Sequence, residues 1–343
     1  MNYDPLEIGE RVAGTMLRKT EKLPDYPTDL GLEGFLYLFD ATKEKKYLDH
    51  VLQVWKFREE NHAAGLDLNS LFTCLHFETY LRTGDKKFIS GFTDKVCSLR
   101  KTVPRDSDGA VCYPVQPETK RILADTLQGY AVLMARTGWL TGDQGFFTEC
   151  MNQYSIVRDI LRNPATGLWH QGRNWSDIPG SVSPGHWNRA QGWVLRGLVD
   201  SLDYLPAGSV FFEVMHGMLQ EYATDITRYQ DNKGMWHQLT DHPESWPETS
   251  GTAMIVHYIY KAFHRGWLPR NPFLSTAEKA LNALFGFVRK DGTVMNTSTG
   301  TCPLNSLEGY EYMPAVPGDP FGAATMLMAC SGPYLARRPI TMI

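Results

Sequence analysis

The sequence predicts an all-α protein, an (α/α)6 barrel in which six helical hairpins form a ring with short β-hairpins at one rim. Three observations support this prediction: apolar residues recur at helical spacing, a helix-ending turn recurs, and a glycine-opened extended segment recurs between pairs of helices. The 343 residues are 43% hydrophobic, and no linker or low-complexity tract divides them. We therefore expect a single domain over residues 1–343.

Apolar residues at spacings of three and four predict the helices. One such stretch contains Leu123, Leu127, Tyr130 and Met134. A short polar turn followed by an aromatic residue recurs between such stretches, as in Thr141-Gly142-Asp143 before Phe146 and Thr83-Gly84-Asp85 before Phe88. Each turn separates two helical patterns, which predicts a helix-turn-helix hairpin.

A second repeated feature alternates with these turns. In each copy a glycine opens a short extended segment, and the copies lie roughly 60 residues apart, the length of two helices with their connections. Closing such an array into a ring covers the ends that an open stack would expose. The four copies begin at Asp108-Gly109, Thr166-Gly167, Lys233-Gly234 and Asp291-Gly292.

Charge and cysteine usage exclude several functions. The 34 basic and 38 acidic residues are mixed along the chain, so nucleic acid is not an expected partner. No apolar run is long enough to cross a membrane and the start of the chain has no signal-like apolar core, so we expect a cytoplasmic protein without a membrane partner. The six cysteines have no metal-binding spacing, so no metal is expected. The sequence leaves self-association into a homo-oligomer open.

Two aspartates at predicted helix starts are the candidate catalytic groups. Asp67 follows Gly65-Leu66, and Asp125 begins the helix that contains Leu127. Two carboxylates in one cleft can divide acid and base work, because each raises the pKa of the other. Carboxylates also cap helices, and this alternative remains for both residues. Which aspartate is the acid stays open at this point.

The segment from His186 to Trp193 provides candidate ligand contacts. Tryptophan faces stack on sugar rings and the arginine fork matches a carboxylate, whereas the alternative is a buried tryptophan pair with a structural arginine. The four candidates here are Trp187, Arg189, Gln191 and Trp193.

Two histidines and a glutamate are open to structural interpretations. His170 and His237 lie in duplicated Trp-His-Gln runs, where we expect His237 to be structural and leave His170 open. Glu248 is expected to cap a helix. No nucleophile elbow, phosphate loop, dinucleotide fingerprint or H-E-x-x-H zinc motif occurs. A carboxylate mechanism without a cofactor remains.

Taken in order, several motifs resemble the unsaturated glucuronyl and rhamnogalacturonyl hydrolases of glycoside hydrolase families 88 and 105, more closely family 105. The similarity runs through nearly the whole chain, and the W-x-R-x-x-G-W segment combined with the later E-T-S is its most specific part. The motifs are Gly65-Leu66-Asp67, Ala124-Asp125-Thr126-Leu127, Gly167-Leu168-Trp169-His170, Trp187 to Trp193, Glu248-Thr249-Ser250 and Gly318-Asp319-Pro320-Phe321-Gly322.

This resemblance implies an (α/α)6 barrel that removes a 4,5-unsaturated uronic acid from the non-reducing end of oligosaccharides released by polysaccharide lyases. The implied chemistry is hydration of the C4=C5 vinyl ether without a cofactor. Asp125 corresponds to the proton donor and water activator, and Asp67 to the second carboxylate. The implied substrate contacts are His170, Trp187, Arg189, Gln191 and Trp193.

The sequence also departs from the family pattern in the cleft. Tyr113 stands where many members have a histidine, and we expect it to contact substrate. The departures leave the aglycone, the sugar that leaves, unpredicted. Two alternatives remain: a sugar 2-epimerase-like isomerase that would use paired histidines such as His170 and His237, and a non-catalytic sugar-binding protein on the same barrel.

Overall fold

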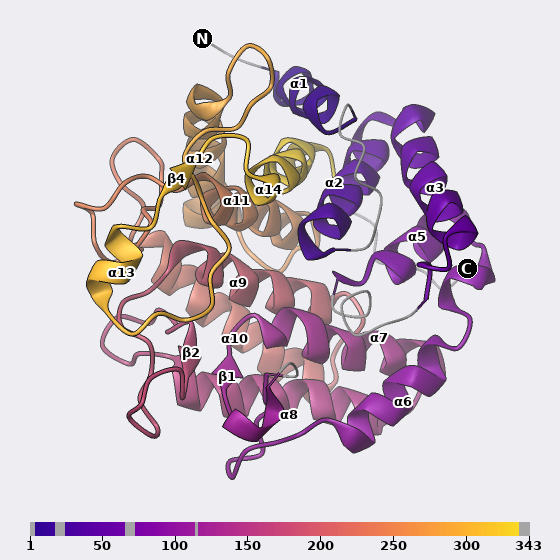
Figure 1. Cartoon of the computed structure of the whole chain (residues 1–343), viewed down its shortest axis with the longest axis vertical. Coiled ribbons are helices and arrows are strands. Elements are labelled where there is room, and N and C mark those ends of the chain that lie inside the picture. The colour runs from indigo at the N-terminus through magenta and orange to yellow at the C-terminus, as the bar shows by residue number, and fades with distance from the viewer. Residues whose placement is uncertain (1–3, 18–24, 66–72, 114–115, 336–343) are drawn as a thin grey trace.

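The computed structural model describes residues 4–17, 25–65, 73–113 and 116–335, and it is almost entirely helical. Helices of the described chain surround a common centre (Figure 1), which confirms the predicted helical barrel. The inner helices are α2 (Tyr26–Thr42), α5 (Leu75–Thr83), α7 (Val132–Thr141), α9 (Asn188–Leu202), α11 (Thr249–His264) and α14 (Pro320–Ser331). The outer helices are α1 (Pro5–Leu17), α3 (Lys45–Glu60), α6 (Phe92–Thr102), α8 (Gln144–Leu161), α10 (Val210–Thr227) and α12 (Ser275–Leu284), and a short helix, α13 (Leu307–Glu311), lies outside the ring.

The inner and outer helices differ in how much of their surface is buried. Every residue of α9 is buried, as are nearly all residues of α11, whereas α10 buries one face only. A helix that is buried all round must be enclosed by other helices. The last inner helix, α14, packs against the first, α2, and this contact closes the ring.

Ion pairs join the inner helices across the buried centre. The Arg196 guanidinium of α9 contacts both carboxylate oxygens of Glu33 on α2, at 2.9 and 2.7 Å. The Lys261 Nζ of α11 lies 2.5 Å from the Asp200 carboxylate of α9. Neither side chain of the Glu33–Arg196 pair is more than 1% exposed, so each charge depends on its partner for the interactions that water would otherwise supply.

The repeated turns have the predicted structure. Gly84 ends α5 and Gly142 ends α7, both with left-handed backbone conformation. The side chain of Asp85 then accepts a hydrogen bond from the Lys87 amide, and that of Asp143 accepts one from the Gly145 amide. Each turn therefore ends an inner helix and begins the next outer element.

The four glycine-opened segments also share one geometry. Their glycines have φ between +77° and +103°, and each segment is closed by the same backbone hydrogen bond across the turn. A side chain is excluded at Gly234, because a Cβ atom there would lie 2.8 Å from the Lys279 carbonyl oxygen. The closing bonds run to the carbonyl of the residue after each glycine: Asp106 to Ala110, Asn163 to Leu168, Asp231 to Met235 and Arg289 to Thr293.

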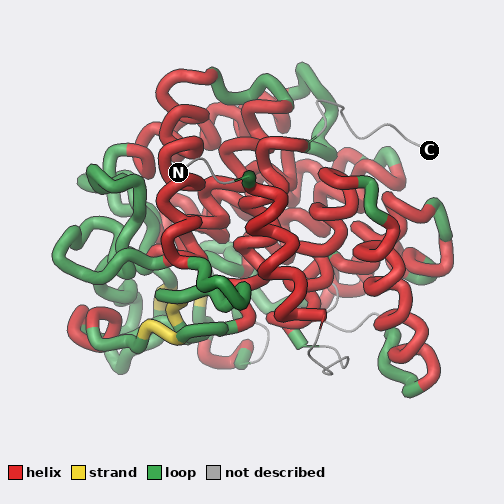
Figure 2. Tube along the Cα trace, turned by 90° about the horizontal axis from the view of Figure 1, so that it is seen from above, coloured by secondary structure: helices red, strands yellow, loops and turns green. Residues whose placement is uncertain are grey.

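Two small antiparallel sheets complete the rim. β1 (Ile122–Leu123) pairs with β2 (Gly172–Arg173), and β3 (Thr297–Ser298) pairs with β4 (Ala315–Val316). Figure 2 shows both sheets on the same side of the molecule, among the loops. The helical pattern that we read from Leu123 was wrong at its start, because Leu123 lies in β1 and the helical backbone begins three residues later.

The cysteines and the helix lengths complete this description. The six cysteines, all of them among the described residues, form no disulfide, and four of them are buried. Among the described helices, none combines the length and the apolar character that crossing a bilayer would require.

Candidate active site

Asp125 lies at the rim, in the turn between β1 and the helix that becomes α7. On one side, β1 pairs with β2, and the Ala124 amide donates to the Gln171 carbonyl at 2.9 Å. On the other side, a π-helical turn over Leu127–Ala131 leads directly into α7. A sheet and a helix therefore fix the position of this aspartate from both sides.

The carboxyl group of Asp125 is poorly solvated. Its Oδ1 atom is buried and accepts no hydrogen bond from any described residue. Burial raises the pKa of Asp125 to about 7, although the positive charge of Arg189 opposes this rise. A substantial fraction of the group is therefore protonated at neutral pH, as a general acid requires. The second predicted carboxylate, Asp67, lies outside the described residues.

Side chains from distant parts of the chain lie close enough to Asp125 for its charge to affect their pKa values. Burial is the main reason that the pKa values of these groups are raised, and the charge on Asp125 raises each of them further. They come from the start of α2, the loop before β1, the loop after β3, and α13. The four groups are Tyr26, Tyr113, Cys302 and Tyr310.

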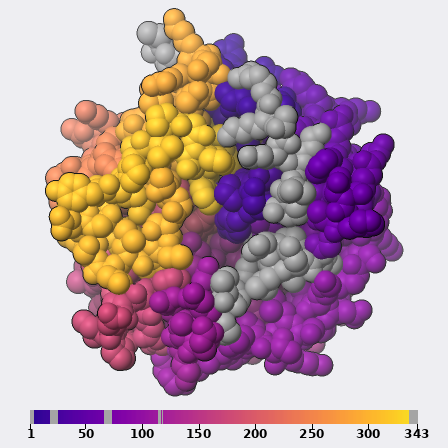
Figure 3. Space-filling model, in the orientation of Figure 1, coloured from indigo at the N-terminus to yellow at the C-terminus, as the bar shows by residue number. Residues whose placement is uncertain are grey.

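The C-terminal part of the chain forms one side of this site. In Figure 3 it covers one side of the rim face, in orange to yellow. Tyr310 of this segment donates a hydrogen bond to the Gln171 side-chain carbonyl at 2.6 Å, and the Gln171 amide donates to the Thr301 carbonyl at 2.9 Å. Gln171 therefore joins the β2 hairpin to residues 298–313, which we call the C-terminal wall.

Gln171 was missed by the sequence analysis, which chose the neighbouring His170. The His170 ring packs against His186, with ring centroids 4.7 Å apart. Burial, followed by the charge of His186, lowers the pKa of His170. Successive residues of an extended segment face opposite sides, so His170 faces away from Gln171 and toward His186. The duplicated Trp-His-Gln run marked the right segment, but it did not indicate which of its residues faces Tyr310.

Most hydrogen-bond donors of the Arg189 guanidinium are used by the protein itself. Its Nη1 donates to the Ser298 carbonyl at 2.6 Å and to the Ser250 hydroxyl at 3.1 Å, and its Nη2 donates to the Thr299 carbonyl at 2.7 Å. The guanidinium carbon also lies 4.2 Å from the Phe321 ring centroid. Arg189 therefore ties the chain after β3 to α9 and contributes a buried positive charge beside Asp125.

Both tryptophans of the same segment fit the packing alternative. Trp187 and Trp193 are each 2% exposed, so neither presents a ring face to solvent. The indole N–H of Trp187 donates to the Ser298 hydroxyl at 3.1 Å. Trp193 packs edge-on against Tyr26, with ring centroids 5.7 Å apart. The two tryptophans therefore pack beneath the surface of the rim and support the residues of the site.

Gln191 is likewise structural, which corrects its prediction as a substrate contact. Its side-chain amide donates to the Trp169 carbonyl at 2.7 Å, and its side-chain oxygen accepts from the Trp169 amide at 3.0 Å and from the Tyr222 hydroxyl at 2.9 Å. It is fully buried, so no polar atom is left for a ligand.

Two residues expected to be structural are confirmed as such. His237 lies between the Asp231 carboxylate, at 3.0 Å, and the Ser245 carbonyl. Glu248 caps α11 by accepting hydrogen bonds from the Ser250 and Gly251 amides at 2.8 and 2.6 Å.

The comparison with protein families shows which family the chain belongs to. Residues 9–334, nearly the whole chain, match the family model for Glycosyl Hydrolase Family 88. The chain belongs to Glycosyl Hydrolase Family 88. The protein is therefore a glycoside hydrolase, as the resemblance of its motifs implied.

Relatives of this family 88 protein agree with the assignment. The chain is 25% identical over 298 residues to the unsaturated rhamnogalacturonyl hydrolase YesR of Bacillus subtilis, covering 84% of this chain and 83% of that protein. It is 29% identical over 110 residues to an unsaturated 3S-rhamnoglycuronyl hydrolase of Formosa agariphila, covering 32% of this chain and 29% of that protein. The solved structure of a family 105 glycoside hydrolase from C. acetobutylicum superposes with a TM-score of 0.83 at 23% identity, over 94% of this chain and 98% of that one.

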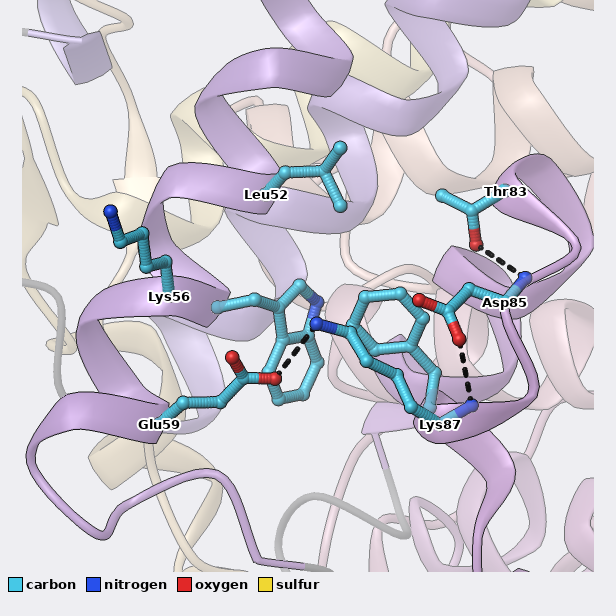
Figure 4. Close-up of a pocket in the computed structure, with 8 residues that line it drawn as sticks. Leu52, Lys56, Glu59, Thr83, Asp85 and Lys87 are labelled. Carbon is cyan, nitrogen blue, oxygen red and sulfur yellow. Dashed lines mark hydrogen bonds and ion pairs between the residues drawn. The ribbon is translucent and has the colours of Figure 1, made fainter.

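A hollow on the outer wall of the family 88 barrel is separate from this site. It encloses about 550 Å³ between α3 and the turn that follows α5 (Figure 4). Its charged side chains have partners within the protein: Lys87 Nζ lies 3.0 Å from the Glu59 carboxylate, Asp85 accepts a hydrogen bond from the Lys87 amide, and Lys56 pairs with Glu60 outside the hollow. None of its lining residues belongs to the group around Asp125.

Proposed function

We propose that this family 88 enzyme removes a 4,5-unsaturated uronic acid, of the glucuronyl or galacturonyl type, from the non-reducing end of oligosaccharides by hydrating the C4=C5 double bond. One observation carries the proposal: Asp125 is a rim carboxyl group whose pKa is raised to about 7 and whose Oδ1 has no hydrogen-bond partner among the described residues. The names of the relatives, which act on unsaturated rhamnogalacturonyl and rhamnoglycuronyl substrates, support the substrate class.

The reaction needs one acid that later becomes a base. Asp125 donates its proton to C4, and the positive charge that develops at C5 is shared with the ring oxygen. Water then bonds to C5 and returns a proton to the Asp125 carboxylate. The resulting hemiketal opens by cleavage of the bond between C5 and the ring oxygen, and the hemiacetal at C1 releases the aglycone as an alcohol. The buried charge of Arg189 favours the carboxylate that exists between the two proton transfers.

Asp67 completes the proposal as the second carboxylate. The family resemblance assigns it this role, and a carboxylate near C5 would favour the positive charge that develops there.

The cytoplasmic location of the protein stays a prediction from the sequence.

The isomerase alternative has little support in the described histidines. His237 is held within its own hairpin by Asp231 and Ser245, whereas His170 packs against His186. The two do not form the pair that proton shuttling would use. A non-catalytic sugar-binding protein would not need an acid of raised pKa.

The test follows the ultraviolet absorbance of an unsaturated uronyl disaccharide. The wild-type protein should remove this absorbance, while Asp125→Asn should slow the reaction at least about 100-fold, because general acid catalysis is lost. Asp108→Asn is the matched control, since Asp108 lies in a rim hairpin with its side chain half exposed, and its rate should stay within about twofold. An unchanged absorbance with the wild-type protein, or an active Asp125→Asn variant, would contradict the proposal.

A further inference from the structure

Three half-exposed side chains beside the active site have no part in the reaction described above. Tyr113, Arg121 and Trp175, which we call the rim platform, are held together by backbone contacts of β1. The Tyr113 amide donates to the Arg121 carbonyl at 2.7 Å. The Trp175 indole N–H donates to the Ile122 carbonyl at 3.0 Å. The platform is therefore as fixed as the sheet that carries it.

The platform combines two aromatic faces with a cation. The ring centroids of Tyr113 and Trp175 are 5.3 Å apart, and the Arg121 guanidinium carbon lies 4.7 Å from the Trp175 ring centroid. The C-terminal wall borders it, because a Cβ atom at Gly172 would lie 2.7 Å from both the Trp175 Nε1 and the Pro303 Cγ. Glycine at 172 thus permits the indole and the wall to pack closely over β2.

The platform lies next to the proposed acid. Arg121 precedes Asp125 by four residues, which span at most about 13 Å when fully extended. Asp125 and Arg121 both affect the pKa of Cys302. Burial raises this pKa, the charge on Asp125 raises it further, and the charge on Arg121 lowers it. The pKa of Tyr113, raised by burial, is affected by both charges in the same directions. When the unsaturated uronic acid is bound at Asp125, the aglycone sugar bonded to it would therefore reach the platform.

The charge of Arg121 is available for a ligand. Its Nη1 donates to the neutral side-chain amide of Gln116, its Nε is buried without a partner, and no carboxylate of the described residues forms an ion pair with it. The nearby Arg173, by contrast, is paired with both Asp106 and Asp108. An arginine stacked on an indole and free of carboxylates is suited to bind an incoming anion.

We propose that the rim platform binds the aglycone sugar and that Arg121 selects aglycones that carry an anionic group, either a sulfate or a carboxylate. The aromatic faces of Trp175 and Tyr113 pack against the sugar ring, and the guanidinium donates to the anion. This inference rests on the proposed function, since it assigns the sugar that the same reaction releases.

Three unsaturated disaccharides that differ only in the aglycone test the inference: rhamnose, 3-O-sulfated rhamnose and galacturonic acid. Wild type should prefer at least one charged aglycone over rhamnose. Arg121→Gln keeps a planar polar side chain without the charge, and it should lower kcat/KM at least about tenfold for the preferred charged substrate and less than about threefold for the neutral one. The two charged substrates show whether sulfate or carboxylate is the group recognised.

Lys120→Gln is the matched control, because it removes the exposed cation directly before Arg121 and should change kcat/KM by less than about twofold for all substrates. The inference is overturned if Arg121→Gln affects all three substrates equally, or none of them, while the wild-type protein is active. Activity of Arg121→Gln on the neutral disaccharide shows that the variant is folded. A wild-type protein that consumes none of the three overturns the proposed function itself.

Discussion

Asp125 differs from the carboxylates that cap helical elements, because its Oδ1 atom is buried and accepts no hydrogen bond from the described residues. Asp85, Asp143 and Glu248 all accept backbone hydrogen bonds at the starts of helical elements. Such bonds favour the charged form of a carboxylate, whereas burial without a donor favours the protonated form. The sequence analysis placed Asp125 and Glu248 at helix starts and Asp85 and Asp143 in turns, but it could not show that the Oδ1 atom of Asp125 has no donor among the described residues.

The raised pKa of Asp125 predicts the pH dependence of the reaction. Because the acid form must donate the proton, kcat/KM for an unsaturated disaccharide should be highest below pH 7 and fall about tenfold per pH unit well above it. Initial rates between pH 5 and 9 test this. A rate that is constant up to pH 9 would contradict an acid with this pKa.

The same shift predicts an effect on stability. The folded state holds the Asp125 proton more tightly than the unfolded chain does, so between about pH 4 and 7 rising pH lowers the free energy of unfolding. Asp125→Asn removes this cost and should raise the free energy of unfolding at pH 8 by about 1 kcal/mol or more, with a smaller gain at pH 5. Urea unfolding at both pH values measures it. Equal effects at the two values would show that the carboxyl group is not buried as described.

At the scale of elements, the attachment of the C-terminal wall to α9 depends on Arg189. Arg189→Ala would remove its bonds to the Ser298 and Thr299 carbonyls and should lower the free energy of unfolding by about 3 kcal/mol. Urea unfolding measures this loss. Unchanged stability together with a higher KM for the uronyl substrate would instead support the sequence-based prediction that Arg189 reads the substrate carboxylate.

The repeated turns and glycine segments were predictable because backbone geometry determines them locally. Gly84, Gly142 and Gly234 adopt conformations that favour glycine, so the sequence pattern and the structure coincide. The pairing of β1 with β2 was not predictable, since its two-residue strands lie about 50 residues apart and carry no alternating pattern. The same limit explains why Gln171 was missed, because its partner Tyr310 comes from a distant segment.

At the scale of the whole molecule, the family resemblance of the sequence and the ring of helices led to the same fold. The helical periods and their spacing predicted hairpins, and α14 packing on α2 closes them into a barrel. The buried ion pairs of the centre were not predicted, because a charged residue within a helical pattern indicates a position that faces solvent. Each of these charged side chains instead pairs with a side chain on another inner helix.

The Glu33–Arg196 pair predicts how the ring responds to a single lost charge. Glu33→Gln would leave Arg196 buried with a weaker partner and should lower the free energy of unfolding by about 3 kcal/mol. Glu10→Gln, which removes an exposed partner of Lys46, is the matched control and should cost less than about 1 kcal/mol. Urea unfolding of both variants checks this, and equal losses would refute the importance of the central pair.

The central claim, that Asp125 delivers a proton to C4, is tested most directly by carrying out the reaction in D2O with an unsaturated uronyl disaccharide and examining the first turnovers by NMR. The account predicts that cleavage by the wild-type protein places one deuterium on a single face of C4, and that Asp125→Asn incorporates none above the rate without enzyme. An initial product that keeps its double bond and its original hydrogen at C4 would mean direct attack at the anomeric carbon, and would contradict the account.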